Sequence, residues 1–295
     1  MLRTIRNRII RKVALRHIAG PDINNAMVVC RWADSKGFRS ILSPWADIDS
    51  NDRPASIVKK NMFERYKLSI DKLNSENLNG YLSIKLNAID FDYGIFKELL
   101  QYGQKYNTRI HVDSLDPDSA DTTFRFLEQA SDYHDILGCT LPSRWRRSLR
   151  DAERAINLNL SIRMVKGQWE DPNRKIDSKK NYILIAEKLA GRAKHIGVAT
   201  HDVSLAETAL KLFTSSATHV ELEQFFSLPL NGIDLANKYI CPYRLYVAYG
   251  HPGIPYNYRF ALTRPNLAFW MISDFAFHRK KPWSDYKNRN TMSST

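Results

Sequence analysis

Residues 158–169 read LNLSIRMVKGQW, an apolar run that ends in two cations and a glycine. The run Leu158–Val165 has the length and the residue types of a buried β-strand. Its ionisable residues, Arg163 and Lys166, fall at the carboxyl end, and a buried charge is costly unless it is paired or used. The pattern is typical of a parallel strand that delivers polar side chains to a site at its end.

Runs of the same kind recur through the chain, at Arg39–Pro44, Tyr81–Ala88, Thr108–Leu115, Asp135–Leu141, Ile196–Thr200, His219–Phe226 and Arg244–Gly250. Helical spacing of apolar residues marks segments between them, including Phe96–Tyr106, Asp118–Ala130, Tyr182–Ala193 and Leu205–Phe213. Alternating strands and helices predict βαβ units, and eight such units fit a closed barrel. We therefore predict an α/β protein whose residues 1–295 form one domain, with a single (β/α)8 TIM-like barrel over about 38–275 and an N-terminal helical appendage over 1–37.

The formal net charge of +13 raises the question of nucleic-acid binding. The basic residues are dispersed, and no zinc-finger spacing, RNA-recognition motif or basic zipper accompanies them. No stretch reaches the ~20 consecutive apolar residues of a membrane span. These observations predict no nucleic-acid partner and at most a peripheral membrane contact through the basic surface.

The three cysteines, Cys30, Cys139 and Cys241, are far apart in the sequence. They form no CxxC pair and no Cys/His metal spacing, which predicts neither a disulfide framework nor a metal site. The small number of dispersed cysteines predicts a cytoplasmic protein, with at most a peripheral contact on the cytoplasmic face of a membrane. The N-terminal MLRTIRNRIIRKVALR lacks the apolar core of a secretory signal, and we interpret it as a retained basic helix.

Polar residues gather at the carboxyl ends of six predicted strands. They are Lys85, Asp113, Arg163 with Lys166, Thr200 with His201, Glu223, and Tyr246. In this architecture those ends meet at one face of the barrel, where active sites lie. One such residue would mean little, whereas six strands in register predict a shared polar pocket.

These residues carry a resemblance to the proline dehydrogenase family. Residues 162–169 resemble the family's "R-L-V-K-G-A-Y", residues 199–202 its "A-T-H-N", residues 83–86 its "S-V-K-L", and residues 112–113 its "I-D-A-E". The stretch from Tyr246 through Tyr256 to Arg259 is similar to "Y-V-P-Y-G … Y-x-x-R". The resemblance runs from about residue 17 to about residue 270, in the same order along the chain.

The resemblance implies an FAD-dependent dehydrogenase that oxidises L-proline, or a close analogue, to 1-pyrroline-5-carboxylate by hydride transfer to flavin N5. It implies catalytic roles for Lys85, Asp113 and Arg163. The implied cofactor-binding residues are Arg163, Lys166, Gly167, Trp169, Thr200, His201 and Glu223. The implied substrate-binding residues are Lys85, Tyr246, Tyr256 and Arg259. A quinone or a small redox protein would accept the electrons.

The sequence departs from the family at four positions. Phe260 stands where the family has a second consecutive arginine, and Thr263 where it has a glutamate. Glu170 replaces an aromatic residue, and Pro142 replaces a glutamine of the fourth strand. Loss of one arginine from the carboxylate clamp predicts weaker proline binding.

Two other functions stay open at this point. One is a family member that supplies the pyrroline for antibiotic (carbapenem-type) biosynthesis, and the other is a catalytically inactive barrel that binds a partner or ligand. The individual residues also have structural interpretations. Lys85 with Asp113 can be a rim ion pair, Glu223 a buried charge paired to a neighbour, and His201 a satisfied polar residue.

Overall fold

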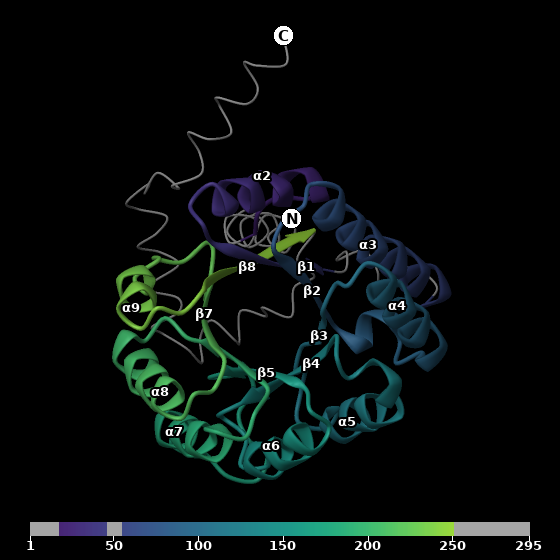
Figure 1. The fold of residues 1–295 in the computed structure, drawn as a ribbon. Helices are drawn as coiled ribbons and strands as arrows, with labels where there is room; N and C mark the ends of the chain where they lie inside the picture. The colour runs from purple at the N-terminus through teal and green to yellow at the C-terminus, as the bar shows by residue number, and fades with distance from the viewer. Residues whose placement is uncertain (1–17, 46–54, 251–295) are drawn as a thin grey trace, which may run out of the picture.

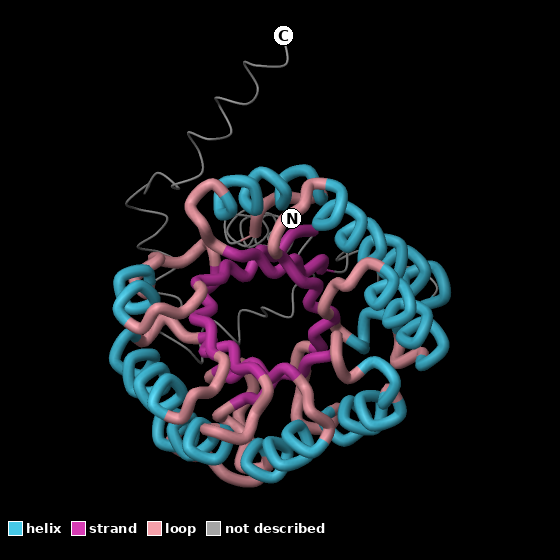
Figure 2. Tube along the Cα trace, in the orientation of Figure 1, coloured by secondary structure: helices cyan, strands magenta, loops and turns pink. Residues whose placement is uncertain are grey.

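The computed structural model describes residues 18–45 and 55–250, and within them eight parallel strands close into a barrel in chain order (Figures 1 and 2). The strands are β1 Arg39–Trp45, β2 Gly80–Ile84, β3 Ile110–Val112, β4 Leu137–Pro142, β5 Ser161–Val165, β6 His195–Ala199, β7 Val220–Phe225 and β8 Tyr243–Gly250. The barrel is closed by β1 and β8, which pair in parallel from Arg39 opposite Arg244 to Trp45 opposite Gly250. The predicted (β/α)8 barrel is confirmed.

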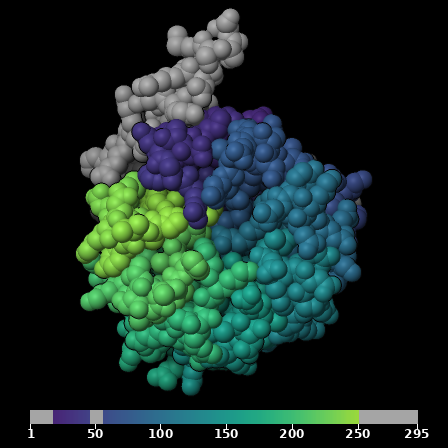
Figure 3. Space-filling model, in the orientation of Figure 1, coloured from purple at the N-terminus to yellow at the C-terminus, as the bar shows by residue number. Residues whose placement is uncertain are grey.

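The helices form a ring outside the strands, as Figure 2 shows in cyan. They are α2 Ile23–Asp34, α3 Ala55–Ser75, α4 Tyr93–Lys105, α5 Ala120–Gln129, α6 Ser148–Asn157, α7 Ser178–Leu189, α8 Val203–Ser215 and α9 Ile233–Lys238, with 3-10 turns η3 Leu86–Ile89 and η4 Ser131–Tyr133. In the space-filling view of Figure 3 these elements follow one another round the molecule in chain order.

The predicted N-terminal appendage contributes α2, which packs outside β1 and β8 (Figure 1). Its inner face is apolar and buried, with Ala26, Cys30 and Ala33 fully enclosed. Two backbone hydrogen bonds fasten the segment before it to β8, from Ala19 N to the carbonyl of Ala248 (2.8 Å) and from Gly250 N to that of Gly20 (2.9 Å). The predicted basic helix at the start of the appendage lies outside the described residues.

Helix α8 shows how the sequence builds an outer element and fixes the strand end before it. Asp202 caps the helix by accepting a hydrogen bond from the backbone N of Leu205 (3.2 Å). Buried residues recur at helical spacing through Phe213, and burying each large apolar side chain contributes roughly 1.5–3 kcal/mol. The cap holds Thr200 and His201, which directly precede it, at the carboxyl end of β6.

The inside of the barrel is polar, whereas the apolar core lies between strands and helices. Arg163, Glu221, Glu223 and Arg244 are all nearly inaccessible to solvent. Glycine makes room for them: a Cβ at Gly197 would lie 2.5 Å from Oε1 of Glu223. Large charged side chains therefore fill the interior in pairs, in place of the branched apolar layers common in such barrels.

Strand β2 ends at Ile84, four residues before the predicted end at Ala88, and α7 begins and ends four residues earlier than predicted. Residues Leu86–Ile89 form η3 instead, and the chain turns through Asp90, whose φ is 55°. Leu86 and Ile89 of η3 are buried as deeply as the apolar residues of the strand. The apolar pattern of the sequence alone cannot distinguish a strand from a 3-10 turn here.

No helix of the described residues is both long enough and apolar enough to cross a membrane.

Candidate functional site

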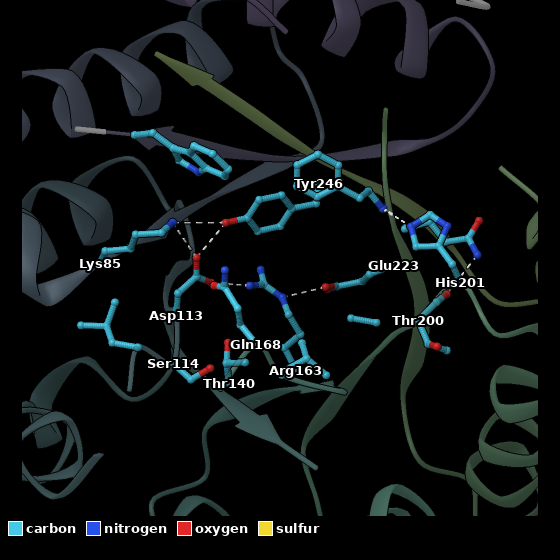
Figure 4. Close-up of a pocket in the computed structure, with 17 residues that line it drawn as sticks. Lys85, Asp113, Ser114, Thr140, Arg163, Gln168, Thr200, His201, Glu223 and Tyr246 are labelled. Carbon is cyan, nitrogen blue, oxygen red and sulfur yellow. Dashed lines mark hydrogen bonds and ion pairs between the residues drawn. The ribbon is translucent and has the colours of Figure 1, made fainter. Parts of the chain in front are cut away.

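A cavity of about 320 Å³ lies at the carboxyl ends of the strands. This volume is at the lower end of the ~300–1,000 Å³ that small-molecule sites occupy. The predicted site residues that line it are Lys85, Asp113, Arg163, Gly167, Thr200, His201, Glu223 and Tyr246 (Figure 4). The structure thus brings to one cavity residues from β5, β7 and β8 and from the segments that follow β2, β3, β5 and β6.

Arg163 is the most enclosed cation of the cavity, with 3% of its side chain exposed. Its Nη1 donates to Oδ1 of Asp113 (2.6 Å) and its Nε to Oε2 of Glu223 (2.8 Å). Its Nη2 donates to the hydroxyl of Tyr81 (2.8 Å). The guanidinium is therefore held rigidly between two carboxylates, and every one of its nitrogens has a protein partner.

Asp113 is an acceptor for four side chains. Oδ1 accepts from Ser83 (2.6 Å) as well as from Arg163, and Oδ2 accepts from Lys85 (3.0 Å) and Tyr246 (2.7 Å). Burial opposes ionisation, but the charges of Lys85 and Arg163 outweigh it and lower the pKa of Asp113 to about 2. Asp113 is a permanent anion at neutral pH and a poor proton acceptor.

Lys85 lies in the segment after β2, and 27% of its side chain is exposed. Its ammonium donates to Asp113 and to Oγ of Ser43 (3.2 Å), and it lies 3.5 Å from the hydroxyl of Tyr246. Burial would lower the pKa of Lys85, but the neighbouring oxygens of Tyr246 and Asp113 raise it above its ordinary value. The pairing of Lys85 with Asp113 expected from the sequence is present, and the cation faces the cavity (Figure 4).

Glu223 lies deeper and is 2% exposed. Besides the bond from Arg163, it accepts one from the hydroxyl of Tyr81 to Oε1 (2.7 Å). Burial raises the pKa of Glu223, and the charge of Arg163 offsets this only in part. Both of its oxygens are bonded within the barrel, so Glu223 holds Arg163 in place, as the structural interpretation of its sequence position expects.

His201 lines the cavity, but both of its ring nitrogens are engaged by backbone. Nε2 accepts from the N–H of Phe225 (2.9 Å), so the ring proton is on Nδ1, which donates to the carbonyl of Pro229 (3.2 Å). Burial lowers the pKa of His201, in keeping with a neutral ring. Thr200 accepts from the N–H of Asp202 (3.1 Å), and its hydroxyl proton has no acceptor in the described part of the chain.

The residues after β5 divide between the cavity and the surface. Gly167 lines the cavity with φ of +87°, and a Cβ there would lie 2.7 Å from Cβ of Pro142. Lys166 is exposed, and Trp169 is 39% exposed; neither lines the cavity. Glu170 forms an ion pair with Arg144.

The other predicted positions fall in two groups. Tyr256, Arg259, Phe260 and Thr263 lie outside the described residues. Pro142 packs against the Gly167 turn, whereas Thr140, on the same strand, lines the cavity.

Sequence reasoning missed the residues that hold the charged groups in place: Ser43, Tyr81 and Ser83. Ser43 and Ser83 are fully buried hydroxyls with apolar neighbours on both sides in the sequence, and Tyr81 is 2% exposed. Polar residues two positions apart on one strand, as Tyr81, Ser83 and Lys85 are, point to the same face. That spacing is the signal by which they could have been found.

Of the comparisons with known proteins, only the one with solved structures finds proteins similar to this chain. No family model matches the chain, and neither does any curated protein. Among solved structures, proline utilization A (PutA) from Bdellovibrio bacteriovorus matches over 92% of this chain and 35% of its own, with 15% identity and a TM-score of 0.72. PutA from Corynebacterium freiburgense matches over 89% and 32%, with 14% identity and a TM-score of 0.64. PutA from Bradyrhizobium japonicum matches over 75% and 28%, with 17% identity and a TM-score of 0.62.

The chain therefore has the same fold as a barrel within the PutA proteins, and it spans about a third of their length. The class that fold and site define is a parallel (β/α)8 barrel with a charged cavity at the carboxyl ends of its strands. At 14–17% identity the likeness establishes the fold and leaves the reaction to be argued from the site.

Proposed function

We propose that this protein is a flavin-dependent dehydrogenase that oxidises L-proline, or a close analogue, to 1-pyrroline-5-carboxylate. The fold it shares with proline utilization A supports the proposal, since one of those structures was inactivated by N-propargylglycine and another has proline bound in remote sites. The order of the motifs from Lys85 to Tyr246 supports it independently. A quinone or a small redox protein would take the electrons, and a cytoplasmic location is part of the proposal.

The observation that carries the proposal is the arrangement of Lys85, Asp113 and Tyr246 on the cavity wall. Asp113 fixes the ammonium of Lys85 at 3.0 Å and the hydroxyl of Tyr246 at 2.7 Å. A fixed cation that faces a small cavity suits a carboxylate ligand. The ring of Tyr246 stacks on Phe225, with 5.4 Å between centroids, and the pair gives the cavity an aromatic wall.

The cavity residues also fit a flavin. A bound flavin supplies the hydride acceptor and becomes electron-rich when it is reduced. Arg163, a fixed cation, is suited to stabilise that state without reorganisation. At the rim, Gly167 leaves space for close approach, and the hydroxyl of Thr200 can donate to a polar ligand. These residues would hold the group, and Lys166 would add a second positive charge nearby.

The described cavity residues include no free proton acceptor. The pKa of Asp113 is about 2, Lys85 stays charged, and both nitrogens of His201 are engaged. Burial raises the pKa of Glu223, but both of its oxygens already accept hydrogen bonds, from Tyr81 and Arg163. The substrate amine must therefore arrive neutral or lose its proton to water. We expect kcat/KM for proline to rise with pH, following the neutral fraction of the amine.

The test is turnover of L-proline by the purified protein with an artificial electron acceptor, monitored by formation of the cyclic imine. Stoichiometric imine supports the proposal, and a biosynthetic role would use the same reaction. The inactive-barrel alternative is favoured by one observation, the complete engagement of Arg163 by protein partners. Purified protein that carries no flavin and forms no imine would support that alternative and contradict the proposal.

A further inference from the structure

The described lining of the cavity holds few charged groups that can bind a carboxylate. Of the two cations among its described lining residues, Arg163 is engaged at every nitrogen. Lys85 remains, with 27% of its side chain exposed. An ammonium is a point charge that attracts a carboxylate without orienting it. A second, directional donor is needed if the ligand is to be held in one pose.

Trp45 ends β1 and lines the same cavity. Its Nε1–H is buried and has no hydrogen-bond partner among residues 18–45 and 55–250. An indole N–H can only donate a hydrogen bond. A buried donor without an acceptor costs free energy, so a ligand that supplies an acceptor would be favoured at this position. The ammonium of Lys85 lies 5.7 Å from the centroid of the indole ring. The cation thus lies over the same indole ring that carries this N–H donor.

The backbone of Trp45 is held in place by neighbours on two sides. The carbonyl of Trp45 accepts a hydrogen bond from Nη1 of Arg65 (3.1 Å) on α3. Trp45 also pairs with Gly250 at the end of β8. Gly250 has φ of +115°, and a Cβ there would lie 2.6 Å from the carbonyl oxygen of Trp45, so glycine is required for this approach.

We infer that Trp45 and Lys85 form a two-point clamp for the carboxylate of a small cyclic ligand. Lys85 supplies the charge, and Nε1–H of Trp45 supplies the directed hydrogen bond. The inference rests on the proposed function, which is the reason for taking the ligand to be cyclic. It assigns a binding residue, Trp45, that the sequence motifs do not include. The inference also bears on Phe260, which stands where the family has a second arginine. A donor from β1 would supply part of the carboxylate binding that this arginine would otherwise provide.

The experiment measures binding, without turnover, to the full-length protein as purified. The probe is cyclopentanecarboxylate, which has the ring and the carboxylate of proline but no ring nitrogen to oxidise, and the reference ligand is cyclopentanol. Trp45→Phe keeps an aromatic ring and removes the N–H. A charge-assisted hydrogen bond corresponds to an affinity factor of roughly 10 to 100. We expect the ratio of carboxylate affinity to alcohol affinity to fall by about that factor in Trp45→Phe.

Trp145→Phe is the matched control. It also removes an indole hydrogen bond, from Nε1 to the carbonyl of Trp169 (3.0 Å), but Trp145 does not line the main cavity. Its affinity ratio should equal that of the wild type, even if the protein loses stability. Three results overturn the clamp: a wild-type protein that does not prefer the carboxylate, an unchanged ratio in Trp45→Phe, or an equal fall in Trp145→Phe. If the affinity ratios behave as expected but the protein does not oxidise proline, the proposed reaction is contradicted and the clamp is not.

Discussion

The guanidinium of Arg163 lies 2.6 Å from the carboxylate of Asp113 and so joins β5 to the segment after β3 across the barrel interior. Asp113 is in turn the acceptor for Lys85 at the cavity wall. The buried carboxylate of Asp113 therefore links Arg163, which stabilises the fold, to Lys85, which faces the cavity. Substitutions here affect stability and binding together, and measurements of unfolding beside those of the reaction separate the two effects.

Arg163→Met should destabilise the protein strongly. It leaves Asp113 and Glu223 as buried carboxylates without their shared partner, and breaking a buried pair in this way costs about 3–5 kcal/mol. Urea unfolding measures the loss. Lys166→Ala, at an exposed position, should change stability by no more than about 0.5 kcal/mol, yet both variants should slow flavin reduction. Wild-type reduction in Lys166→Ala would show that this residue takes no part in the reaction.

Lys85 and Asp113 should behave as one unit in catalysis. Lys85→Met and Asp113→Asn each disrupt the 3.0 Å ion pair, so the double variant should lose little more kcat/KM than either single variant. The double-mutant cycle is measured with proline as substrate. Losses that simply add would mean that Asp113 does not act through Lys85.

Acid should weaken the fold through Asp113. Its pKa is lowered to about 2 in the folded protein from an ordinary value of 3.8, so ionised Asp113 stabilises the fold at all pH values above about 4. That contribution, about 2 kcal/mol, is lost as the pH falls from 4 through 2. The free energy of unfolding of wild type and Asp113→Asn, measured between pH 2 and 6, should converge at the acid end. A constant difference over that range would contradict the assigned pKa.

Gly167→Ala should destabilise the turn after β5 and reduce flavin retention. The residue has φ of +87°, and the new Cβ would lie 2.7 Å from Cβ of Pro142, so the backbone must shift. Gly37→Ala is the matched control, because Gly37 has φ of +74° with no atom near the new Cβ. Both should lose about 1 kcal/mol through the left-handed conformation, and only Gly167→Ala should lose more. Equal losses would show that the Pro142 contact is easily relieved.

The barrel was predictable because alternating apolar runs and helical segments are a local signal that repeats eight times. Where a run continued into a buried turn, as from Ile84 into Leu86–Ile89, the pattern could not show the strand end. Burial there depends on packing against α3 and α4, which the local sequence does not encode.

Part of the site was predictable for a similar reason: charged residues at strand ends, such as Lys85 and Asp113, stand out in apolar surroundings. What they contact was not predictable. The engagement of Arg163 by Glu223, two strands away, depends on the register of the closed barrel. The unpaired indole N–H of Trp45 is visible only once every neighbouring acceptor has been placed.

The most direct test of the central claim is the absorbance of the flavin-loaded protein, mixed anaerobically with L-proline. Pyrrolidine, which lacks the carboxylate that Lys85 is proposed to bind, is the control. The account predicts that proline bleaches the flavin in a single exponential phase with saturable dependence on concentration, and that pyrrolidine does so far more slowly. A flavin that remains oxidised with proline, or that is reduced equally well by pyrrolidine, would contradict it.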